Sequence, residues 1–343
     1  MKQEELEDRV RELFERQNFS LKTVEHGFKA FKKDLELDLK IFSSQKYNKE
    51  DLRDIITGKD KVFVDKGFED LDNSFENSFS VLESEEPEEK FETPSYEIIG
   101  DIAVISDLTD FDEDDAVEGI LHHQPQIETV LLKEEGLKGE YRVGEYRKLY
   151  GDTTETVHTE FGCRYKVDPT KVYFSERFST ERKRVVDQIK DGEKVLIMFS
   201  GIGPFAIMAA KLANPSKVVA VEKNPVAAKY QRENIRLNSV EDVVESIEGD
   251  VDEKAPELGS FDRIIMPLPG SADKFLELAL AHTEVKGAVH YYRFLEDNKW
   301  SLLEEEVREA GSKAGKKVQI ANKAFCGERA AYIDRVCLDV VVE

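Results

Sequence analysis

The C-terminal half of this chain is predicted to form an α/β domain with a doubly wound, mostly parallel sheet. From residue 179 onward, short apolar runs alternate with segments of helical periodicity. The first run, VLIMF, ends in a turn that contains Gly201 and Gly203 and leads directly into an alanine-rich helix. The second run ends at Glu222. Strands that alternate with helices at this spacing imply a parallel sheet.

The expected elements of this domain follow one another without long gaps. Helices are predicted at 179–190, 204–213, 225–238 and 271–282, and strands at 194–199, 217–222, 243–248, 262–266 and 286–292. The end of the chain, 329–343, alternates between apolar and polar residues, as expected for a final antiparallel strand. We assign these elements to one domain at 176–343.

Two smaller parts precede this domain. Strand candidates at 96–106, 129–133, 163–168 and 171–175 suggest a compact α+β module at 94–175. An amphipathic helix at 3–17 and a hairpin at 27–44 suggest an N-terminal α+β domain at 1–82. The segment 83–93 between them is an acidic linker that contains a proline.

The composition excludes several classes of protein. The chain has 343 residues, of which 40% are hydrophobic, and no apolar run approaches the ~20 residues of a membrane helix. Its first residues, MKQEELEDRV, do not resemble a signal peptide. Its three cysteines lie far apart, which argues against a disulfide framework and a structural zinc site. We expect a monomeric cytoplasmic protein that contains no metal and contacts no membrane.

The net charge of −23 predicts long-range repulsion from nucleic acid. The acidic residues are unevenly distributed, because the stretches 83–92 and 107–118 hold many of them and are interpreted as solvated faces or linkers. Between residues 133 and 184 the balance reverses, with twelve Lys/Arg and ten Asp/Glu. The charge therefore does not exclude a polyanionic partner.

The turn after the first strand has the composition of a nucleotide-binding turn. Gly201 and Gly203 permit close approach of the backbone to a ligand, and Pro204 suits the first turn of a helix. Glu222 is placed to accept hydrogen bonds from both ribose hydroxyls, and Asp250 to accept one from an adenine amino group. With Ala206 at the sixth position, the glycine pattern alone fits both NAD and S-adenosylmethionine.

The fourth strand ends in the proline-rich sequence MPLPGSADKF, which contains Pro267 and Pro269. In open α/β sheets, substrates bind at the carboxyl ends of the parallel strands. This turn is therefore a candidate for contact with a substrate.

Five separated motifs carry a resemblance to a known family. They are GEYRVGEYRKLYGDTTETVHTEFGCRYKVDPTKVYFSERFSTER, MFSGIGPF, EKNPVAAKYQRENIRLN, IIMPLPGSADKFL and HYYRF. Together they resemble the archaeal and eukaryotic tRNA methyltransferases that modify N1 of guanine at position 37. The resemblance covers about residues 94–343 and implies a Rossmann-like class I methyltransferase domain. It also implies S-adenosylmethionine as cofactor and tRNA, not DNA, as partner.

The resemblance implies two catalytic residues. The glutamate of the motif that ends in Glu-Arg corresponds to Glu181, which would remove the N1 proton as the methyl group transfers. An arginine would stabilise the negative charge that develops on O6. The stretch GEYR occurs twice, ending at Arg142 and Arg147. We choose Arg142 and keep Arg147 as the alternative.

The motifs also imply which residues bind the two ligands. The expected cofactor contacts are Phe199, Gly201, Gly203, Pro204, Phe205, Glu222, Lys223, Asn224, Asp250, Val251, Pro267, Leu268 and Pro269. The expected contacts to the target base are Arg142, Tyr173, Arg177, Glu181, Pro267 and Pro269.

The chain departs from the family pattern at two positions. The family usually has an acidic residue where this chain has Ile197, and an asparagine where it has Pro267. We expect the methionine end of the cofactor to depend on the Gly201–Gly203 amides and on neighbouring backbone carbonyls. Ile197→Asp would then tighten cofactor binding, provided that the carboxylate reaches the site. Two alternatives stay open at this point. One is the related aminocarboxypropyltransferase of wybutosine synthesis, and the other is a tRNA-binding protein that has lost catalysis.

Overall fold

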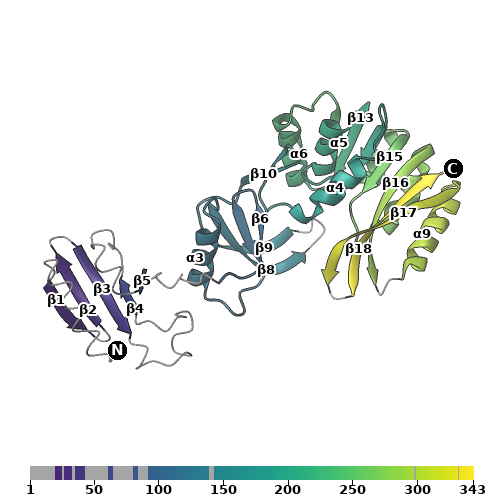
Figure 1. The fold of residues 1–343 in the computed structure, drawn as a ribbon. Helices are drawn as coiled ribbons and strands as arrows, with labels where there is room; N and C mark the ends of the chain where they lie inside the picture. The colour runs from purple at the N-terminus through teal and green to yellow at the C-terminus, as the bar shows by residue number, and fades with distance from the viewer. Residues whose placement is uncertain are drawn as a thin grey trace. The chain divides into compact units, whose positions relative to one another are not determined.

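The computed structural model describes residues 92–138, 143–296, 299–330 and 332–343, together with a set of N-terminal strands (Figure 1). The chain divides into two compact units, Met1–Lys90 and Phe91–Glu343. The described part of the first unit is a sheet ordered β1-β2-β3-β4-β5. Its strands are β1 Ser20–Val24, β2 Gly27–Lys32, β3 Leu35–Phe42, β4 Lys61–Val64 and β5 Ser80–Glu83. The predicted hairpin at 27–44 is confirmed, since β2 and β3 pair antiparallel, whereas the predicted helix at 3–17 lies outside the described residues.

The second unit begins with a sheet ordered β6-β7-β8-β9. Its elements are β6 Tyr96–Ile99, β7 Ile102–Ile105, α3 Glu113–His123, β8 Thr129–Lys138 and β9 Val143–Tyr150. The predicted strand pair at 96–106 is confirmed. The interpretation of 107–118 as a solvated face is confirmed, because its acidic side chains are exposed and the second half of the stretch forms the start of α3. Asp112 caps this helix by accepting a hydrogen bond from the Asp114 N–H, and acidic residues in a first helical turn interact favourably with the helix dipole.

A separate hairpin, β10 Thr156–Glu160 and β11 Cys163–Val167, connects this sheet to the rest of the unit. The side chains of Asn234 and Asn238 bond to the backbone of β11 at Lys166 and Arg164, with N···O distances of 2.6–3.0 Å. The strand predicted at 171–175 does not form. The Asp168 carboxylate accepts from the Thr170 N–H at 3.0 Å and thereby stabilises a turn in its place.

The largest sheet of the described residues has seven strands in the order β14-β13-β12-β15-β16-β18-β17. They are β12 Lys194–Ile197, β13 Lys217–Glu222, β14 Val244–Glu248, β15 Phe261–Met266, β16 Thr283–Glu296, β17 Val318–Ala330 and β18 Ile333–Val342. Strands β12 to β16 are parallel, and β17 and β18 are antiparallel additions. The predicted doubly wound α/β class is confirmed, and the final antiparallel strand expected at 329–343 forms as β18. Strand β17, which pairs with it, is additional.

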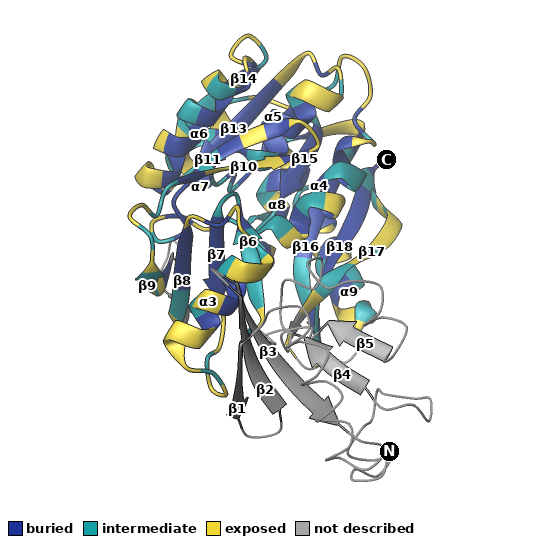
Figure 2. Ribbon diagram, turned by 60° about the vertical axis from the view of Figure 1, so that its left-hand side comes forward, coloured by how far each residue is buried: buried dark blue, intermediate teal, exposed yellow. Residues whose placement is uncertain are grey.

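Helices cover both faces of this sheet (Figure 2). The predicted helices form as α4 Ser179–Val186, α5 Pro204–Leu212, α6 Pro225–Leu237 and α8 Asp273–Ala281, and η2 Glu176–Phe178, α7 Val251–Lys254, η3 Ala255–Glu257 and α9 Trp300–Lys313 are additional. Apolar side chains of α4, α5 and α6 pack in one core with alternate strand residues such as Val195 and Ile197. Their neighbours Leu196 and Met198 pack in a second core with α8 and α9. This alternation explains why the parallel strands are continuous apolar runs.

Ile197 is a core residue. Its side chain is fully buried in the cluster that contains Phe205 and Tyr292. The expectation that a carboxylate at this position would reach the cofactor is therefore wrong, because the side chain points into the core under α4 and α5.

Replacement of Ile197 by aspartate is expected to destabilise the protein by about 4 kcal/mol or more, because a charge without a partner would be buried. The free energy of unfolding in denaturant measures this loss. The matched variant Ile197→Val should lose only about 1 kcal/mol. An aspartate variant as stable as the native protein would contradict the assignment of Ile197 to the core.

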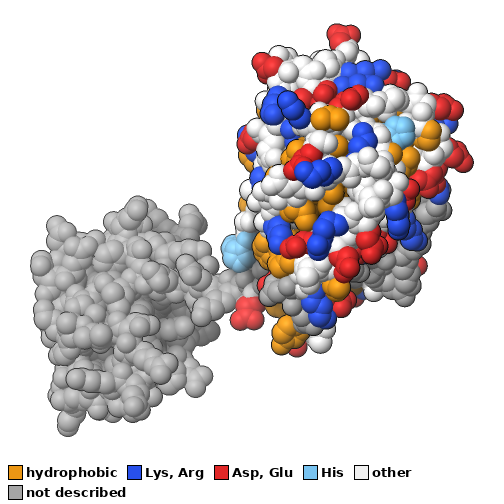
Figure 3. Space-filling model, turned by 90° about the vertical axis from the view of Figure 1, so that its right-hand side faces the viewer, with side chains coloured by type: hydrophobic (Ala, Val, Ile, Leu, Met, Phe, Trp, Pro, Cys, Tyr) orange, Lys and Arg blue, Asp and Glu red, His pale blue; other side chains and the backbone are white. Residues whose placement is uncertain are grey.

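No helix among the described residues is long and apolar enough to cross a membrane. Figure 3 shows Lys and Arg side chains interspersed with Asp and Glu over one face of the C-terminal unit.

Candidate functional site

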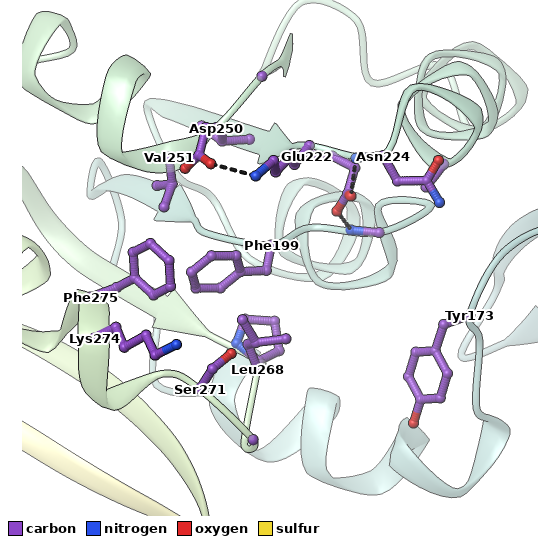
Figure 4. Close-up of a pocket in the computed structure, with 17 residues that line it drawn as sticks. Tyr173, Phe199, Glu222, Asn224, Asp250, Val251, Leu268, Ser271, Lys274 and Phe275 are labelled. Atoms are coloured by element: carbon purple, nitrogen blue, oxygen red, sulfur yellow. Dashed lines mark hydrogen bonds and ion pairs between the residues drawn. The ribbon is translucent and has the colours of Figure 1, made fainter. Parts of the chain in front are cut away.

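A cavity of about 520 Å³ opens where the parallel strands end, as the topology of the sheet predicts (Figure 4). Residues that follow β12, β13, β14 and β15 form its walls. The lining residues that the sequence predicts are Tyr173, Phe199, Gly201, Glu222, Lys223, Asn224, Asp250, Val251, Pro267 and Leu268. The cavity is thus built mainly from the motifs that suggested a cofactor site.

The turn after β12 has the backbone conformation that its glycines suggested. Gly201 has φ +59° and Gly203 has φ +91°. A Cβ atom added to Gly201 would meet no atom within 4 Å, so the backbone here faces open space. A Cβ atom added to Gly203 would lie 3.1 Å from the Gln231 side chain. Gly201 therefore leaves room for a ligand, and Gly203 permits close packing against α6.

Glu222 joins this turn to the next strand. Its Oε2 accepts from the Gly201 N–H at 2.7 Å, and its Oε1 accepts from the Asn224 N–H at 2.7 Å. The Gly203 N–H donates to the Ser200 carbonyl at 3.0 Å. The expectation that the Gly201 and Gly203 amides hold a ligand is therefore wrong, since both are used within the protein. Each Glu222 oxygen keeps a lone pair for a further donor.

Two charged side chains lie across the end of the cavity near β14. Lys223 and Asp250 form an ion pair of 2.8 Å (Figure 4). The hydrogen bond from Lys223 lowers the pKa of the Asp250 carboxyl below its ordinary value. Asp250 also caps α7 by accepting from the Asp252 N–H at 3.1 Å. This carboxylate is ionised and fixed at the cavity wall, where it can accept a hydrogen bond.

The cavity also contains an aromatic pair and residues that the sequence did not suggest. The rings of Phe199 and Phe275 meet edge to face with centroids 4.9 Å apart. The additional lining residues are Val221, Ala227, Gly249, Gly270, Ser271, Lys274 and Phe275. Four of these continue the proline-rich turn into α8, so extending the predicted contact region beyond Pro269 would have included them.

A smaller cavity of about 90 Å³ adjoins the first in the described part of the chain. Both cavities are lined by Tyr173, Phe199, Gly201 and Pro267. Three predicted residues, Pro204, Phe205 and Pro269, line only the smaller cavity, which also includes further aromatic side chains. Its aromatic and proline walls suit a flat ring.

Two arginines that the sequence did not suggest also line this smaller cavity. Arg182 is buried and forms a bidentate ion pair with Glu160 at 2.7 and 2.6 Å. The guanidinium of Arg335 lies 4.1 Å from the centre of the Phe178 ring. The smaller cavity is thus mainly apolar, with two guanidinium groups in its lining.

Glu181 is not among the residues that line this cavity. It is buried on α4, beside Phe178 and Arg182, which do line the cavity. Arg184 donates two hydrogen bonds to its carboxylate, at 2.7 and 2.8 Å, and the Tyr292 hydroxyl donates a third at 2.6 Å. These three hydrogen bonds hold the carboxylate in one orientation.

The other residues predicted to contact the substrate are distributed differently. Arg142 lies outside the described residues. Arg147 lies exposed on β9, where it pairs with Glu113 and Glu134, away from both cavities. Arg177 is exposed and pairs with Glu97 at 2.6 Å. The structure therefore brings Tyr173, Pro267 and Pro269 together at the cavities, but not Arg147 or Arg177.

One group of metal-capable side chains occurs among the described residues, namely His290, Cys337 and Asp339. Asp339 already binds Arg184, and the second nitrogen of His290 lies 2.7 Å from Arg263. Burial raises the pKa of the Cys337 thiol well above its ordinary value, so it stays protonated. This group is satisfied by protein cations and does not offer a free set of ligands.

Comparison with known proteins gives consistent matches. Residues 156–321 match the family model of the TRM5/TYW2 methyltransferase domain. The chain is 38% identical over 278 residues to a Pyrococcus abyssi protein named tRNA (guanine(37)-N(1))-methyltransferase Trm5b, covering 76% of this chain and 81% of the relative. It is 40% identical over 207 residues to tRNA 4-demethylwyosine(37)-methyltransferase Taw21 of Saccharolobus solfataricus, covering 59% and 79%.

A third relative represents a different reaction. It is a Methanocaldococcus jannaschii protein named tRNA(Phe) (4-demethylwyosine(37)-C(7)) aminocarboxypropyltransferase, which is 32% identical over 230 residues, covering 62% of this chain and 90% of the relative. Among solved structures, Trm5b from Pyrococcus abyssi superposes with a TM-score of 0.67 at 37% identity, covering 73% and 75% of the two chains. Methanocaldococcus jannaschii TYW2 in complex with AdoMet superposes with a TM-score of 0.58 at 27% identity, covering 73% and 99%.

Proposed function

Because this chain belongs to the TRM5/TYW2 methyltransferase family, we propose that it transfers a methyl group from S-adenosylmethionine to N1 of guanine 37 in tRNA. The observation that carries this proposal is the pair of adjoining cavities that share Tyr173, Phe199, Gly201 and Pro267. A methyl donor in the larger cavity would meet a flat base in the smaller one at this shared wall. The alignment with the relative named for this reaction covers 76% of this chain and 81% of that relative.

The residues around the larger cavity fit S-adenosylmethionine. The space beside the Gly201 backbone is open, and a side chain at this position would occupy it. Glycine therefore leaves room for a ligand against the backbone. Glu222 offers lone pairs to the two ribose hydroxyls, and Asp250 offers an acceptor to the adenine amino group. When bound, S-adenosylmethionine supplies an electrophilic methyl group on sulfonium.

The residues of this chain provide the acid–base chemistry. The N1 atom of guanine carries a proton at neutral pH, so it needs a base as the N1–methyl bond forms and the sulfur–methyl bond breaks. We assign this role to Glu181, whose carboxylate receives the proton. We assign stabilisation of the charge on O6 to Arg142. Pro267 and Pro269 lie at the smaller cavity and position the base from one side.

The direct test is methylation of a tRNA transcript that carries guanine at position 37, with an adenine-37 transcript as control. A mass gain of one methyl group on the guanine transcript alone is expected. A larger mass gain on a 4-demethylwyosine-37 tRNA would identify an aminocarboxypropyltransferase, and a methyl gain on that tRNA alone would identify a Taw21-type activity. Binding of tRNA without any transfer would indicate lost catalysis.

We further propose that Met1–Lys90 contributes contacts to tRNA. Deletion of residues 1–90 is expected to weaken tRNA binding by about tenfold or more and to leave S-adenosylmethionine affinity unchanged, because Phe91–Glu343 is a compact unit that contains both cavities. Filter binding and calorimetry measure the two affinities. Loss of cofactor affinity in the shortened chain would show that the boundary at the acidic linker is wrong.

Cofactor affinity is expected to decrease on mild acidification. Burial raises the pKa of the Glu222 carboxyl above its ordinary value, although the hydrogen bonds from the Asn224 and Gly201 N–H groups oppose this shift. The ribose hydroxyls need the ionised form, so affinity is complete above this raised pKa and falls as the pH drops through it. Calorimetry across a pH series should detect this loss of affinity at a pH higher than that at which ordinary glutamates protonate. The same loss in Glu222→Gln would assign it to another group.

A further inference from the structure

Glu181 is one end of a chain of charged side chains that crosses the buried face of the sheet. Arg184 donates to Glu181 at 2.7 and 2.8 Å and also to Asp339 at 2.6 and 3.1 Å. Asp339 accepts from His290 at 2.7 Å, and beyond His290 lies the ion pair of Arg263 with Glu193, 2.8 Å long. One guanidinium thus lies between two carboxylates on different elements.

The surroundings of Asp339 keep it ionised. Burial opposes the charge, but hydrogen bonds from His290 and Arg184 hold the pKa of this carboxyl well below its ordinary value. Arg263 donates to the second nitrogen of His290, so the imidazole is neutral and donates from Nδ1 to Asp339. Burial and the neighbouring guanidinium groups lower the pKa of His290, which agrees with this assignment. Asp339 is therefore a fixed negative charge.

The ionisable groups near Glu181 come from four elements. They are Arg184 on α4, Tyr292 on β16, Cys326 on β17, and Arg335, Cys337 and Asp339 on β18. Burial raises the pKa of Tyr292 and of both thiols, so these three groups stay neutral. Arg184 and Asp339 thus carry the charges that contact Glu181 directly or through one guanidinium.

If Asp339 were absent, proton uptake by Glu181 would leave the Arg184 guanidinium without a counter-ion. Once Glu181 is neutral, Arg184 loses one of its two counter-ions in a partly buried position, where a charge without a counter-ion is destabilising. We propose that Asp339 is a positioning residue for methyl transfer, because it remains as the counter-ion of Arg184 when Glu181 accepts the proton from the target base. This inference rests on the proposed function, in which Glu181 is the base.

Shared use of Arg184 can be tested without measuring activity. In Glu181→Gln or in Asp339→Asn, the other carboxylate still pairs with Arg184, whereas the double variant leaves the guanidinium without an anion. The denaturation midpoint of the double variant should therefore fall by more than the sum of the two single losses. Glu193→Gln is the matched control, since it removes a partly buried paired carboxylate that contacts neither Arg184 nor Glu181. The decrease in midpoint caused by Glu193→Gln should simply add to the decrease caused by Glu181→Gln. If the decreases caused by Glu181→Gln and Asp339→Asn also simply add, the proposal is overturned.

The kinetic test uses the pH dependence of single-turnover methylation. In Asp339→Asn, Arg184 pairs only with Glu181, so the ionised carboxylate is favoured. The rate should fall by about tenfold while its acid limb moves to lower pH. In Arg184→Met, the carboxylate loses its cation, so the acid limb should move to higher pH. An unchanged acid limb in either variant overturns the proposal, and the Arg184 variant decides if Asp339→Asn does not fold. Absence of methylation by the native protein would instead refute the proposed function and leave the stability test to decide.

Discussion

Replacing Glu181 with glutamine is expected to slow single-turnover methylation of guanine 37 by about a hundredfold or more. The glutamine amide cannot take the N1 proton, but it retains the shape of the carboxylate and can still accept from Tyr292 and Arg184. Affinity for tRNA and for S-adenosylmethionine should change little, because Glu181 lines neither cavity of the described chain. Rapid mixing of enzyme, cofactor and tRNA measures the rate of the chemical step.

Glu176→Gln is the matched control for this variant. Glu176 is a partly buried carboxylate on the turn that leads into α4, and it lines neither of these cavities. Its rate should stay within a few-fold of the native rate. If Glu181→Gln behaves in the same way, Glu181 is not the base.

The assignment of the catalytic arginine is tested in the same assay. The methylation rate of Arg142→Ala should fall by about as much as that of Glu181→Gln. Arg147→Ala should lose little because Arg147 pairs with Glu113 and Glu134 at the surface.

The parallel sheet and the cavity were predictable from local patterns. Strands β12 and β13 are short apolar runs, and a cofactor motif stands at the end of each, as Gly201 does after β12 and Glu222 at the end of β13. Topology then brings the carboxyl ends of these strands together without further information. Local sequence patterns were therefore sufficient to predict the parts of the site in which a motif directly follows its strand.

The partners of Glu181 could not be predicted in this way. Tyr292 lies 111 residues from Glu181, and Asp339 lies 155 residues from Arg184. Nothing in the spacing of these residues indicates that β16, β18 and α4 bring them together. The expectation that position 197 contacts the cofactor is wrong for a related reason. The place of a residue in a strand does not reveal whether its side chain faces the cavity or the helices. Burial in the core under α4 and α5 settles this point.

Replacing Glu222 with alanine is expected to reduce affinity for S-adenosylmethionine by about two to four orders of magnitude. Two hydrogen bonds from the ribose hydroxyls would be lost, each worth roughly 1.5–3 kcal/mol when the acceptor is charged. The same change leaves the N–H groups of Gly201 and Asn224 without their acceptor, so the turn that faces the cofactor loses its support. Calorimetric titration measures the affinity directly.

The design of the control separates these two effects. Glu222→Gln keeps one carbonyl acceptor for a backbone N–H but removes the charge, so its affinity should lie between those of the native protein and the alanine variant. Glu248→Ala removes a carboxylate at the end of the neighbouring strand β14 that pairs with Arg232 and does not line the cavity, so it should bind the cofactor normally. Native affinity in Glu222→Ala would mean that the ribose is held elsewhere. The Lys223–Asp250 pair would then be the next candidate, because it is the other charged feature of this wall.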